Sequence, residues 1–391
     1  MYKLNYPMKY FSLQLIFSLL FSSLYAQKTI NNPAFSSRNS RILEIEKIVS
    51  SDTATVFYFK AYFEPGNWLK INKGSFILAD NSSEKLFVKA ATGIQLDDRF
   101  VLPATGETAF SLTFPAVGAS AKKVDFIESE CDACFKIYDI ELTPVKKTSV
   151  LPESLLGNWF KVSGEKGWYA GLYDTVAVYK NQVWKYGQPT IKGNKFTINL
   201  FNESGQASIQ ALKDRHSQYR LSSQDVILLG NTPPLSIYGK GVPQTLKTAI
   251  INKADSAIYK GYIKGYSTKL GFRTGQVLVN NAASGKQESY PINVAPDGSF
   301  SVRFPLSTAE TVMVRFSNIA ETVFIEPGKE VFHLMDNNSR EAQSLFMGAS
   351  SYLNYELRNS ASVTNPDKQK PKDPSSASIK GLNPYTESTK K

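Results

Sequence analysis

The stretch TATVFYFKAYF, residues 53–63, decides the fold class of this chain. Its β-branched and aromatic residues alternate with polar or small ones, which is the period-two pattern of a strand with one buried face. Further segments of this kind follow at short spacing, among them GSFILAD (74–80), KLFVKAATGI (85–94), FVLPATGETAFSLTFPAV (100–117) and CFKIYDIEL (134–142). About seven short strands separated by turn signals predict a β-sandwich.

The middle of the chain is rich in aromatic residues and in turns that contain glycine. Residues 155–202 hold three of the four tryptophans, which are Trp159, Trp168 and Trp184. Short strands joined by such turns predict a small antiparallel meander or partial barrel.

The last third of the chain alternates clearly in GSFSVRFPL (298–306) and ETVMVRFSN (310–318), which predicts a second β-sandwich. The period then changes over residues 339–360, where four apolar residues fit one face of a helix: Leu345, Phe346, Leu353 and Leu357. We therefore expect a helix near residues 340–358.

These patterns together predict an all-β chain in which two β-sandwich-like domains flank a small antiparallel β meander or partial barrel. A single C-terminal helix and a disordered tail rich in Pro, Ser and Lys complete the expected architecture. The expected boundaries are a signal peptide at 1–26, a β-sandwich at 27–147 with a flexible leader over 27–40, an aromatic-rich antiparallel domain at 148–244, a β-sandwich with the helix at 245–358, and the tail at 359–391.

The composition excludes some classes of function. Hydrophobic residues make up 42% of the 391 residues, which is enough for real cores. The formal net charge is +11, but the surplus Lys and Arg are spread along the chain. A nucleic-acid partner would need them concentrated on one face, so none is expected. No second apolar stretch is long enough to span a membrane.

The first 27 residues predict export. Lys3 and Lys9 precede an apolar run from Phe11 to Leu24, and the small residue Ala26 leads into Gln27. That is the pattern of a cleaved signal peptide, because a membrane-spanning helix needs roughly 20 apolar residues. An uncleaved membrane anchor is the alternative. Export would place the chain in the periplasm or cell envelope.

Cys131 and Cys134 are the only cysteines, and their C-x-x-C spacing suits a redox-active pair, a metal-bound or free pair, or a structural disulfide. A reactive dithiol gains from a helix N-terminus, whereas FKIYDIEL after Cys134 is a strand pattern. The acidic residues Glu128, Glu130 and Asp132 also surround the pair, and negative charge raises a thiol pKa. We expect a structural disulfide that closes a turn at a strand edge.

The aromatic residues Trp159, Trp168, Tyr169 and Trp184 could form a platform for a ligand or a partner protein. The alternative is core packing, since aromatic residues dominate core burial. Trp168 lies next to Gly167 in a polar turn, so we expect it to be the most exposed of the three tryptophans in this segment.

No catalytic constellation, cofactor motif or metal-ligand cluster stands out. The two histidines, His216 and His333, lie in different expected domains and have no neighbours at ligand spacing. We therefore expect no catalytic residues, no metal and no cofactor.

Four motifs resemble a known family: GYIKGY (261–266), PDGSFSVRFPL (296–306), FIEPGKEV (324–331) and FMGASSYLNYEL (346–357). They are similar to the region that precedes the thioredoxin domain in exported TlpA-like thiol–disulfide oxidoreductases of Bacteroidetes-type bacteria. The aromatic segment 155–186 looks like one found upstream in longer members. The resemblance implies an accessory region that acts with a thioredoxin domain.

The chain departs from that family after Leu357, where no Trp-Cys-x-x-Cys turn opens a helix. The redox activity of the family therefore carries over to no residue here. Two functions remain. The first is a non-catalytic envelope protein that binds a partner protein or ligand through its β domains. The second is the accessory region of a TlpA-like oxidoreductase, with a thioredoxin-like protein as its partner.

Overall fold

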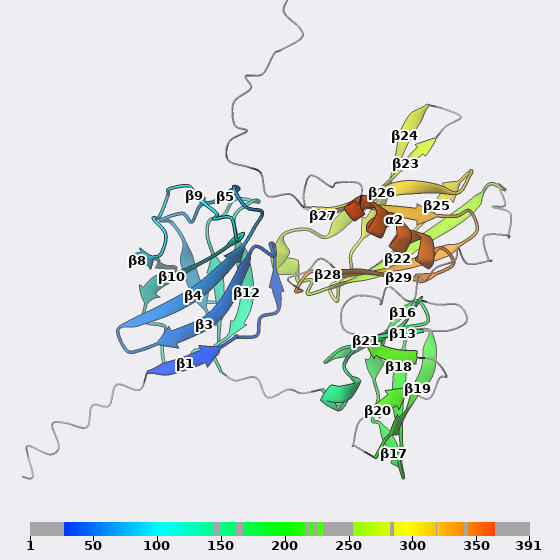
Figure 1. Cartoon of the computed structure of the whole chain (residues 1–391), viewed down its shortest axis with the longest axis horizontal. Helices are drawn as coiled ribbons and strands as arrows, with labels where there is room; N and C mark the ends of the chain where they lie inside the picture. The colour runs from blue at the N-terminus through cyan, green and yellow to red at the C-terminus, as the bar shows by residue number, and fades with distance from the viewer. Residues whose placement is uncertain are drawn as a thin grey trace, which may run out of the picture.

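The computed structural model describes residues 27–143, 149–161, 167–215, 219–221, 226–229, 253–281, 285–317, 319–339 and 343–363. More than half of these residues lie in β-strands and the only α-helix among them is near the C-terminal end, so the predicted all-β class is confirmed (Figure 1). The predicted signal peptide at 1–26 and the predicted tail beyond residue 363 lie outside the described residues.

The first domain is a sandwich of two five-stranded sheets. One sheet has the order β1 (Lys28–Asn31), β3 (Leu43–Ser50), β4 (Ala54–Tyr62), β10 (Glu107–Pro115) and β8 (Ala90–Thr92). The other has the order β2 (Ser37–Arg38), β12 (Lys136–Glu141), β11 (Lys123–Ile127), β6 (Phe76–Ala79) and β7 (Leu86–Phe87). At one end, β5 (Trp68–Leu69) pairs with β9 (Phe100–Val101) as a separate ribbon (Figure 1).

Strand β4 shows why the alternating segment decides this fold. Its residues are alternately half-buried and buried along the whole strand. Phe57 and Phe59 point into the core, and the Phe59 ring lies 5.0 Å from that of Phe126 on the facing sheet. Aromatic contacts of this kind hold the two sheets together.

The predicted flexible leader over residues 27–40 is wrong. Strand β1 pairs with β3, and β2 pairs with β12. Arg38 is fully buried, and its Nη1 atom donates to the carbonyl of Leu43 at 3.1 Å and to Oε1 of Glu44 at 2.8 Å. The polar composition misled because a buried Arg is tolerated where its guanidinium has hydrogen-bond and ion-pair partners, as the Nη1 atom of Arg38 does.

The second domain is a nine-stranded antiparallel sheet that curves into a half-barrel, as predicted. Its order along the sheet is β20 (Tyr219–Leu221), β19 (Gly205–Lys213), β18 (Lys195–Asn202), β16 (Gln182–Tyr186), β15 (Val176–Tyr179), β14 (Gly167–Leu172), β13 (Gly157–Lys161) and β21 (Val226–Leu229), and β17 (Thr190–Lys192) pairs with β18. A short 3₁₀ helix, Glu153–Leu155, precedes it.

The third domain is the second predicted sandwich. One sheet has the order β25 (Ser299–Leu306), β22 (Asp255–Lys264), β28 (Glu330–Asp336) and β29 (Gln343–Gly348), and the other has β24 (Lys286–Asn293), β23 (Thr274–Asn281), β26 (Glu310–Phe316) and β27 (Ile319–Ile325). β22 and β28 pair in parallel, while the other neighbours in these two sheets are antiparallel.

The predicted helix near residues 340–358 is wrong in its first half. The helix α2 spans Ser351–Val363, whereas Gln343–Gly348 form strand β29 at the edge of β28. Leu345, Phe346 and Met347 are all buried, which a strand between two covered faces allows. The helix also includes residues 359–363, which were expected to belong to the tail.

We predict that Phe59→Ala lowers the free energy of unfolding of the first domain by about 3–5 kcal/mol, because a fully buried ring leaves a cavity in a packed core. Chemical denaturation measures the change. The control is Phe87→Ala, since Phe87 belongs to the same domain but is 51% exposed and should cost far less. Equal losses in the two variants would contradict the assignment of the core.

Candidate functional site

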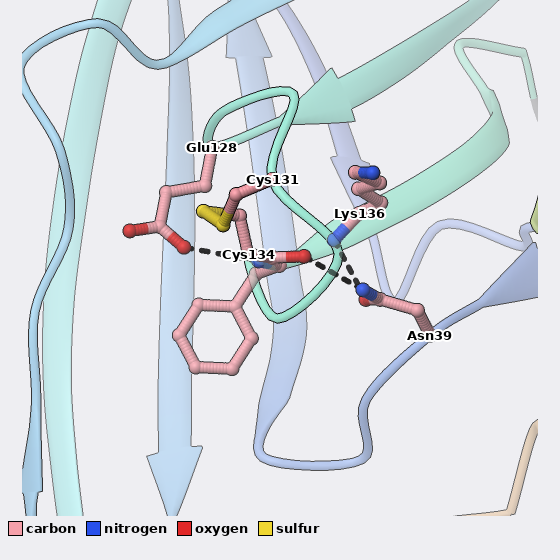
Figure 2. Close-up of a disulfide and its surroundings, with 6 residues drawn as sticks. Asn39, Glu128, Cys131, Cys134 and Lys136 are labelled. Carbon is pink, nitrogen blue, oxygen red and sulfur yellow. Dashed lines mark hydrogen bonds between the residues drawn. A yellow bond between two sulfur atoms is a disulfide. The ribbon is translucent and has the colours of Figure 1, made fainter. Parts of the chain in front are cut away.

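The two cysteines lie in the loop that joins β11 to β12. Their sulfur atoms are 2.01 Å apart and their Cα atoms 5.3 Å apart, so the predicted disulfide is confirmed (Figure 2). Asn39 fixes this loop, since its Nδ2 atom donates to the carbonyl of Cys134 at 2.6 Å and its Oδ1 atom accepts from the Lys136 amide at 2.8 Å. The pair thus closes a hairpin, and strand β12 follows it directly.

An acidic side chain supports the same loop. Oε2 of Glu128 accepts a hydrogen bond from the backbone amide of Phe135 at 2.9 Å (Figure 2). Burial raises the pKa of Glu128, although this backbone hydrogen bond acts in the opposite direction. A thiolate is stabilised by positive charge nearby. Glu128 supplies none, whether its carboxyl group is neutral or ionised.

The three tryptophans of the second domain are buried, so the prediction that Trp168 is exposed is wrong. Their exposed fractions are 2% for Trp159, 5% for Trp168 and 6% for Trp184. Trp159 and Trp184 line the inside of the half-barrel, where their Nε1 atoms donate to the carbonyls of Leu155 and Tyr179. Both are core residues.

Trp168 points to the opposite face of the sheet, toward the third domain. Its ring lies 6.5 Å from that of Phe332 on β28, and Phe160 and Val178 of the second domain belong to the same apolar cluster. Trp168 is therefore a contact residue, but the surface that it contacts belongs to its own chain. The residues around Trp168 do not indicate this burial, because the domain that covers Trp168 lies far away in the sequence.

Tyr169, the fourth residue of the expected platform, is half-buried. Its hydroxyl lies 3.4 Å from that of Tyr179, and the Lys161 ammonium lies 5.9 Å from its ring centre. Because the neighbouring tryptophans face inward or toward the third domain, these four side chains do not form one exposed aromatic platform.

The fourth tryptophan is the exposed one. Trp68 on β5 is 47% exposed and lies directly opposite Val101 on β9, which is 60% exposed. Directly opposed residues share one face of a ribbon, and the Arg99 guanidinium lies 4.4 Å from the centre of the Trp68 ring. Sequence analysis missed this surface because Trp68 lies outside the aromatic-rich segment. A lone Trp after Pro-Gly-Asn was the available signal.

A second surface feature is an acidic pocket on the first domain, built by a β-bulge. One residue of β11 faces two residues of β12 between Val124 and Phe126, and Asp139 within this bulge has a φ of +52°. The irregularity turns Asp139 toward Asp125, whose Oδ1 atom accepts from the Asp139 amide at 2.7 Å. Two carboxylates from adjacent strands thereby meet at one point.

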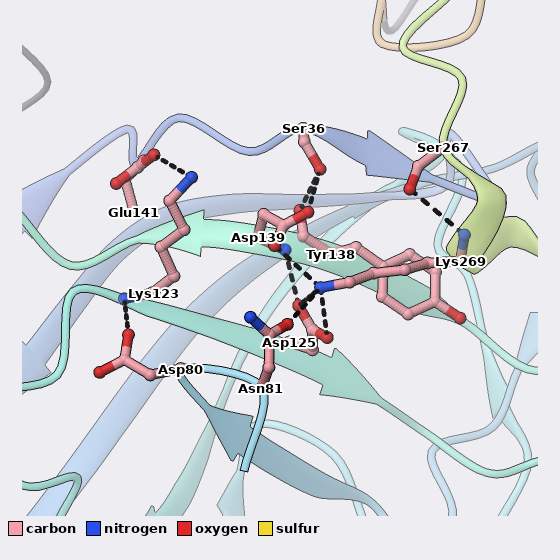
Figure 3. Close-up of polar contacts among 10 residues, drawn as sticks. All are labelled: Ser36, Asp80, Asn81, Lys123, Asp125, Tyr138, Asp139, Glu141, Ser267 and Lys269. Carbon is pink, nitrogen blue, oxygen red and sulfur yellow. Dashed lines mark hydrogen bonds and ion pairs between the residues drawn. The ribbon is translucent and has the colours of Figure 1, made fainter. Parts of the chain in front are cut away.

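Lys269 of the third domain inserts into this pocket (Figure 3). Its Nζ atom lies 2.8 Å from Oδ1 of Asp139, 3.1 Å from Oδ2 of Asp125 and 3.1 Å from Oδ1 of Asn81. Burial lowers the Lys269 pKa, but the bonds to the two carboxylates outweigh this effect and raise it overall. The three oxygen-bearing residues thus form a binding site for a primary ammonium group.

Asn81, Asp125 and Asp139 also line a cavity of about 90 Å³. All of its lining residues belong to the first domain: Leu78, Asp80, Asn81, Lys123, Val124, Asp125 and Asp139. Asp80 accepts hydrogen bonds from the Lys122 and Lys123 amides, which fixes the rim. Nothing in the sequence links Lys269 to carboxylates more than 100 positions earlier, so this site could not be predicted.

A buried polar cluster lies inside the third domain. Tyr259 and His333 are fully buried and 2.8 Å apart, between the tyrosine hydroxyl and Nδ1. The His333 Nε2 atom faces Oε2 of Glu321 at 3.2 Å, and Arg358 of α2 pairs with the same carboxylate. The carboxylate of Glu321 thus lies between the His333 ring and the Arg358 guanidinium. The cluster ties α2 to the sheet.

The pKa values of this cluster follow from its burial. Burial lowers the pKa of His333, although Glu321 acts in the opposite direction. Burial would raise the pKa of Glu321, but His333 and Arg358 lower it to about 2. Because no substrate can reach a fully buried Tyr–His pair, we interpret the cluster as structural.

Comparison with known proteins gave no match to a family model, a curated protein or a solved structure. Within the described ranges, no three His, Cys, Asp or Glu side chains are grouped so that they could hold a metal ion. His216 lies outside those ranges. No helix in the described part of the chain has the length and apolar character needed to cross a membrane.

We predict that the free energy of unfolding falls as the pH drops from about 7.5 to 5, with a contribution from His333 of up to about 1.4 kcal/mol per pH unit. The folded-state pKa of His333 is lowered, so the unfolded chain binds the proton first and stability is lost on acidification. Urea denaturation at several pH values measures the slope. His333→Gln should flatten it, and an unchanged slope would contradict the burial argument.

We also predict that the purified chain does not accelerate the reduction of insulin by dithiothreitol. The element that follows Cys134 is strand β12, so the pair does not lie at a helix N-terminus, which would lower a thiol pKa. Turbidity of the precipitating insulin chain is the measurement, with thioredoxin as the active control. An acceleration that Cys131→Ser abolishes would contradict the prediction.

Proposed function

We propose that this chain is an exported cell-envelope protein that binds a partner protein through its β domains. The observation that carries the proposal is the exposed surface formed by Trp68, Val101 and Arg99 at the end of the first domain, which we call the ribbon surface. Trp and Arg are the residues most enriched among those that dominate binding energies.

The packing of the β5–β9 ribbon supports a role in binding. Leu69 is buried beneath it and Phe100 packs against the same core, so the opposite face is anchored. The Arg99 guanidinium stacks on the Trp68 ring, which restricts both side chains before any partner arrives. Exposed side chains that are already ordered lose less conformational entropy on binding.

Export is supported by the sequence of the first 27 residues and by the chemistry of the cysteines. The charged start, the apolar run and Ala26 match a signal peptide. Cys134 is half-buried and Cys131 exposed, and a disulfide with such access persists best in an oxidising compartment such as the periplasm.

A second candidate function rests on the resemblance to TlpA-like oxidoreductases, in which the partner would be a thioredoxin-like protein. The four resembling motifs lie at the end of β22, at the turn into β25, at the Pro-Gly turn before β28, and from β29 into α2. Identification of the captured partner separates the two candidates, because a thioredoxin-like protein would contain a Trp-Cys-x-x-Cys sequence.

We predict that Trp68→Ala reduces capture of the envelope partner at least about tenfold, which corresponds to the loss of one dominant contact. The measurement is affinity capture from a bacterial envelope extract followed by mass spectrometry. The matched control is Ile191→Ala, since Ile191 of the second domain is 62% exposed and distant in sequence from the ribbon surface. Equal capture by wild type and Trp68→Ala would refute the role of this surface.

A further inference from the structure

The third domain contacts its two neighbours in different ways. With the second domain it shares one apolar cluster, which includes Phe160, Trp168 and Val178 from one side and Phe332 and Phe346 from the other. The apolar cluster of the first domain contains first-domain residues alone among those that the structure describes. The first and third domains are therefore joined by polar contacts without a common core.

One of these polar contacts joins the charged Arg38 and two asparagine side chains to backbone carbonyls. The Arg38 Nη2 atom donates to the carbonyl of Asn338 at 3.0 Å, and the Asn337 side chain donates to the carbonyl of Arg38 at 2.5 Å. The Asn338 side chain donates in turn to the carbonyl of Ser36 at 2.8 Å. Short strand β2 and the end of β28 thus meet at a small contact, which we call the pivot.

The other contact is ionic, and both of its halves are preformed. The pocket with Asp125 and Asp139 is shaped by first-domain residues alone, through the bulge and the hydrogen bond from the Asp139 amide to the Asp125 carboxylate. Lys269 sits on a one-turn 3₁₀ helix whose cap, Ser267, accepts from the Lys269 amide at 3.3 Å. Neither half needs the other in order to fold, so the contact can form and break between folded domains.

We propose that Lys269, Asp125 and Asp139 form an ionic lock that sets the angle between the first and third domains, and that the first domain rotates about the pivot when the lock opens. The lock is specific because one ammonium group meets carboxylates from two strands and the amide oxygen of Asn81 (Figure 3). It is releasable because its lysine side chain keeps 31% of its exposure and water can replace each contact.

The polar character of this interface fits a reversible contact. Interfaces between domains of one chain are commonly polar and permit relative motion unless they are large and hydrophobic. The interface between the second and third domains is hydrophobic, whereas the interface between the first and third domains is not. The expected motion is therefore that of the first domain against the other two, which move as one body.

Small-angle X-ray scattering of the full chain tests the lock. Lys269→Met keeps the length of the side chain and removes its charge, so the radius of gyration should increase by on the order of 2 Å over that of wild type. Asp139→Asn should give the same increase from the other side of the lock. The double variant should expand no further than either single variant, because both changes break one interaction.

The matched control is Lys329→Met, which removes an exposed lysine from the same domain and should leave the radius of gyration unchanged. Circular dichroism confirms that each variant is folded. A wild-type radius in Lys269→Met, or an equal expansion in Lys329→Met, would overturn the proposal.

Discussion

The packing of Trp168 against Phe332 fixes the relation between two of the three domains. Strands β13, β14 and β15 turn apolar side chains outward as well as inward, and the outward ones are covered by β28 and β29. Each large apolar side chain buried in this way stabilises the arrangement by about 1.5–3 kcal/mol. The polar contact between Asn181 and Glu330, at 3.0 Å, adds orientation at the margin of this surface.

The contact between the first and third domains contributes much less to stability. A partly exposed ion pair contributes about 0–1 kcal/mol, so the bonds of Lys269 to two carboxylates contribute less than the burial of one or two aromatic rings. The contact between the second and third domains is therefore strong, and the contact between the first and third domains is weak. The surface around Trp68 belongs to the weakly joined domain, so its direction relative to the rest of the molecule depends on the ionic contact.

Local sequence predicted the strands well because period-two alternation reports one buried face, as in β4 and β10. It also predicted the disulfide, because a C-x-x-C pair before a strand pattern sits at a turn. It failed where burial comes from a distant segment. Trp168 is covered by another domain, the Arg38 guanidinium bonds to the carbonyls of Leu43 and Asn338, and β29 is a strand because β28 offers it an edge. The Lys269 site likewise joins residues of two domains that lie more than 100 positions apart.

The apolar cluster shared by the second and third domains also determines which parts of the chain can be produced as separate fragments. A fragment that ends between them would expose Phe160 and Val178 on one piece and Phe332 and Phe346 on the other, all of which are nearly or completely buried in the intact chain. Exposed apolar patches of this kind promote aggregation. The half-barrel and the C-terminal sandwich should therefore be expressed together and melt in one cooperative transition, whereas the first sandwich has a core of its own and is the natural piece to isolate.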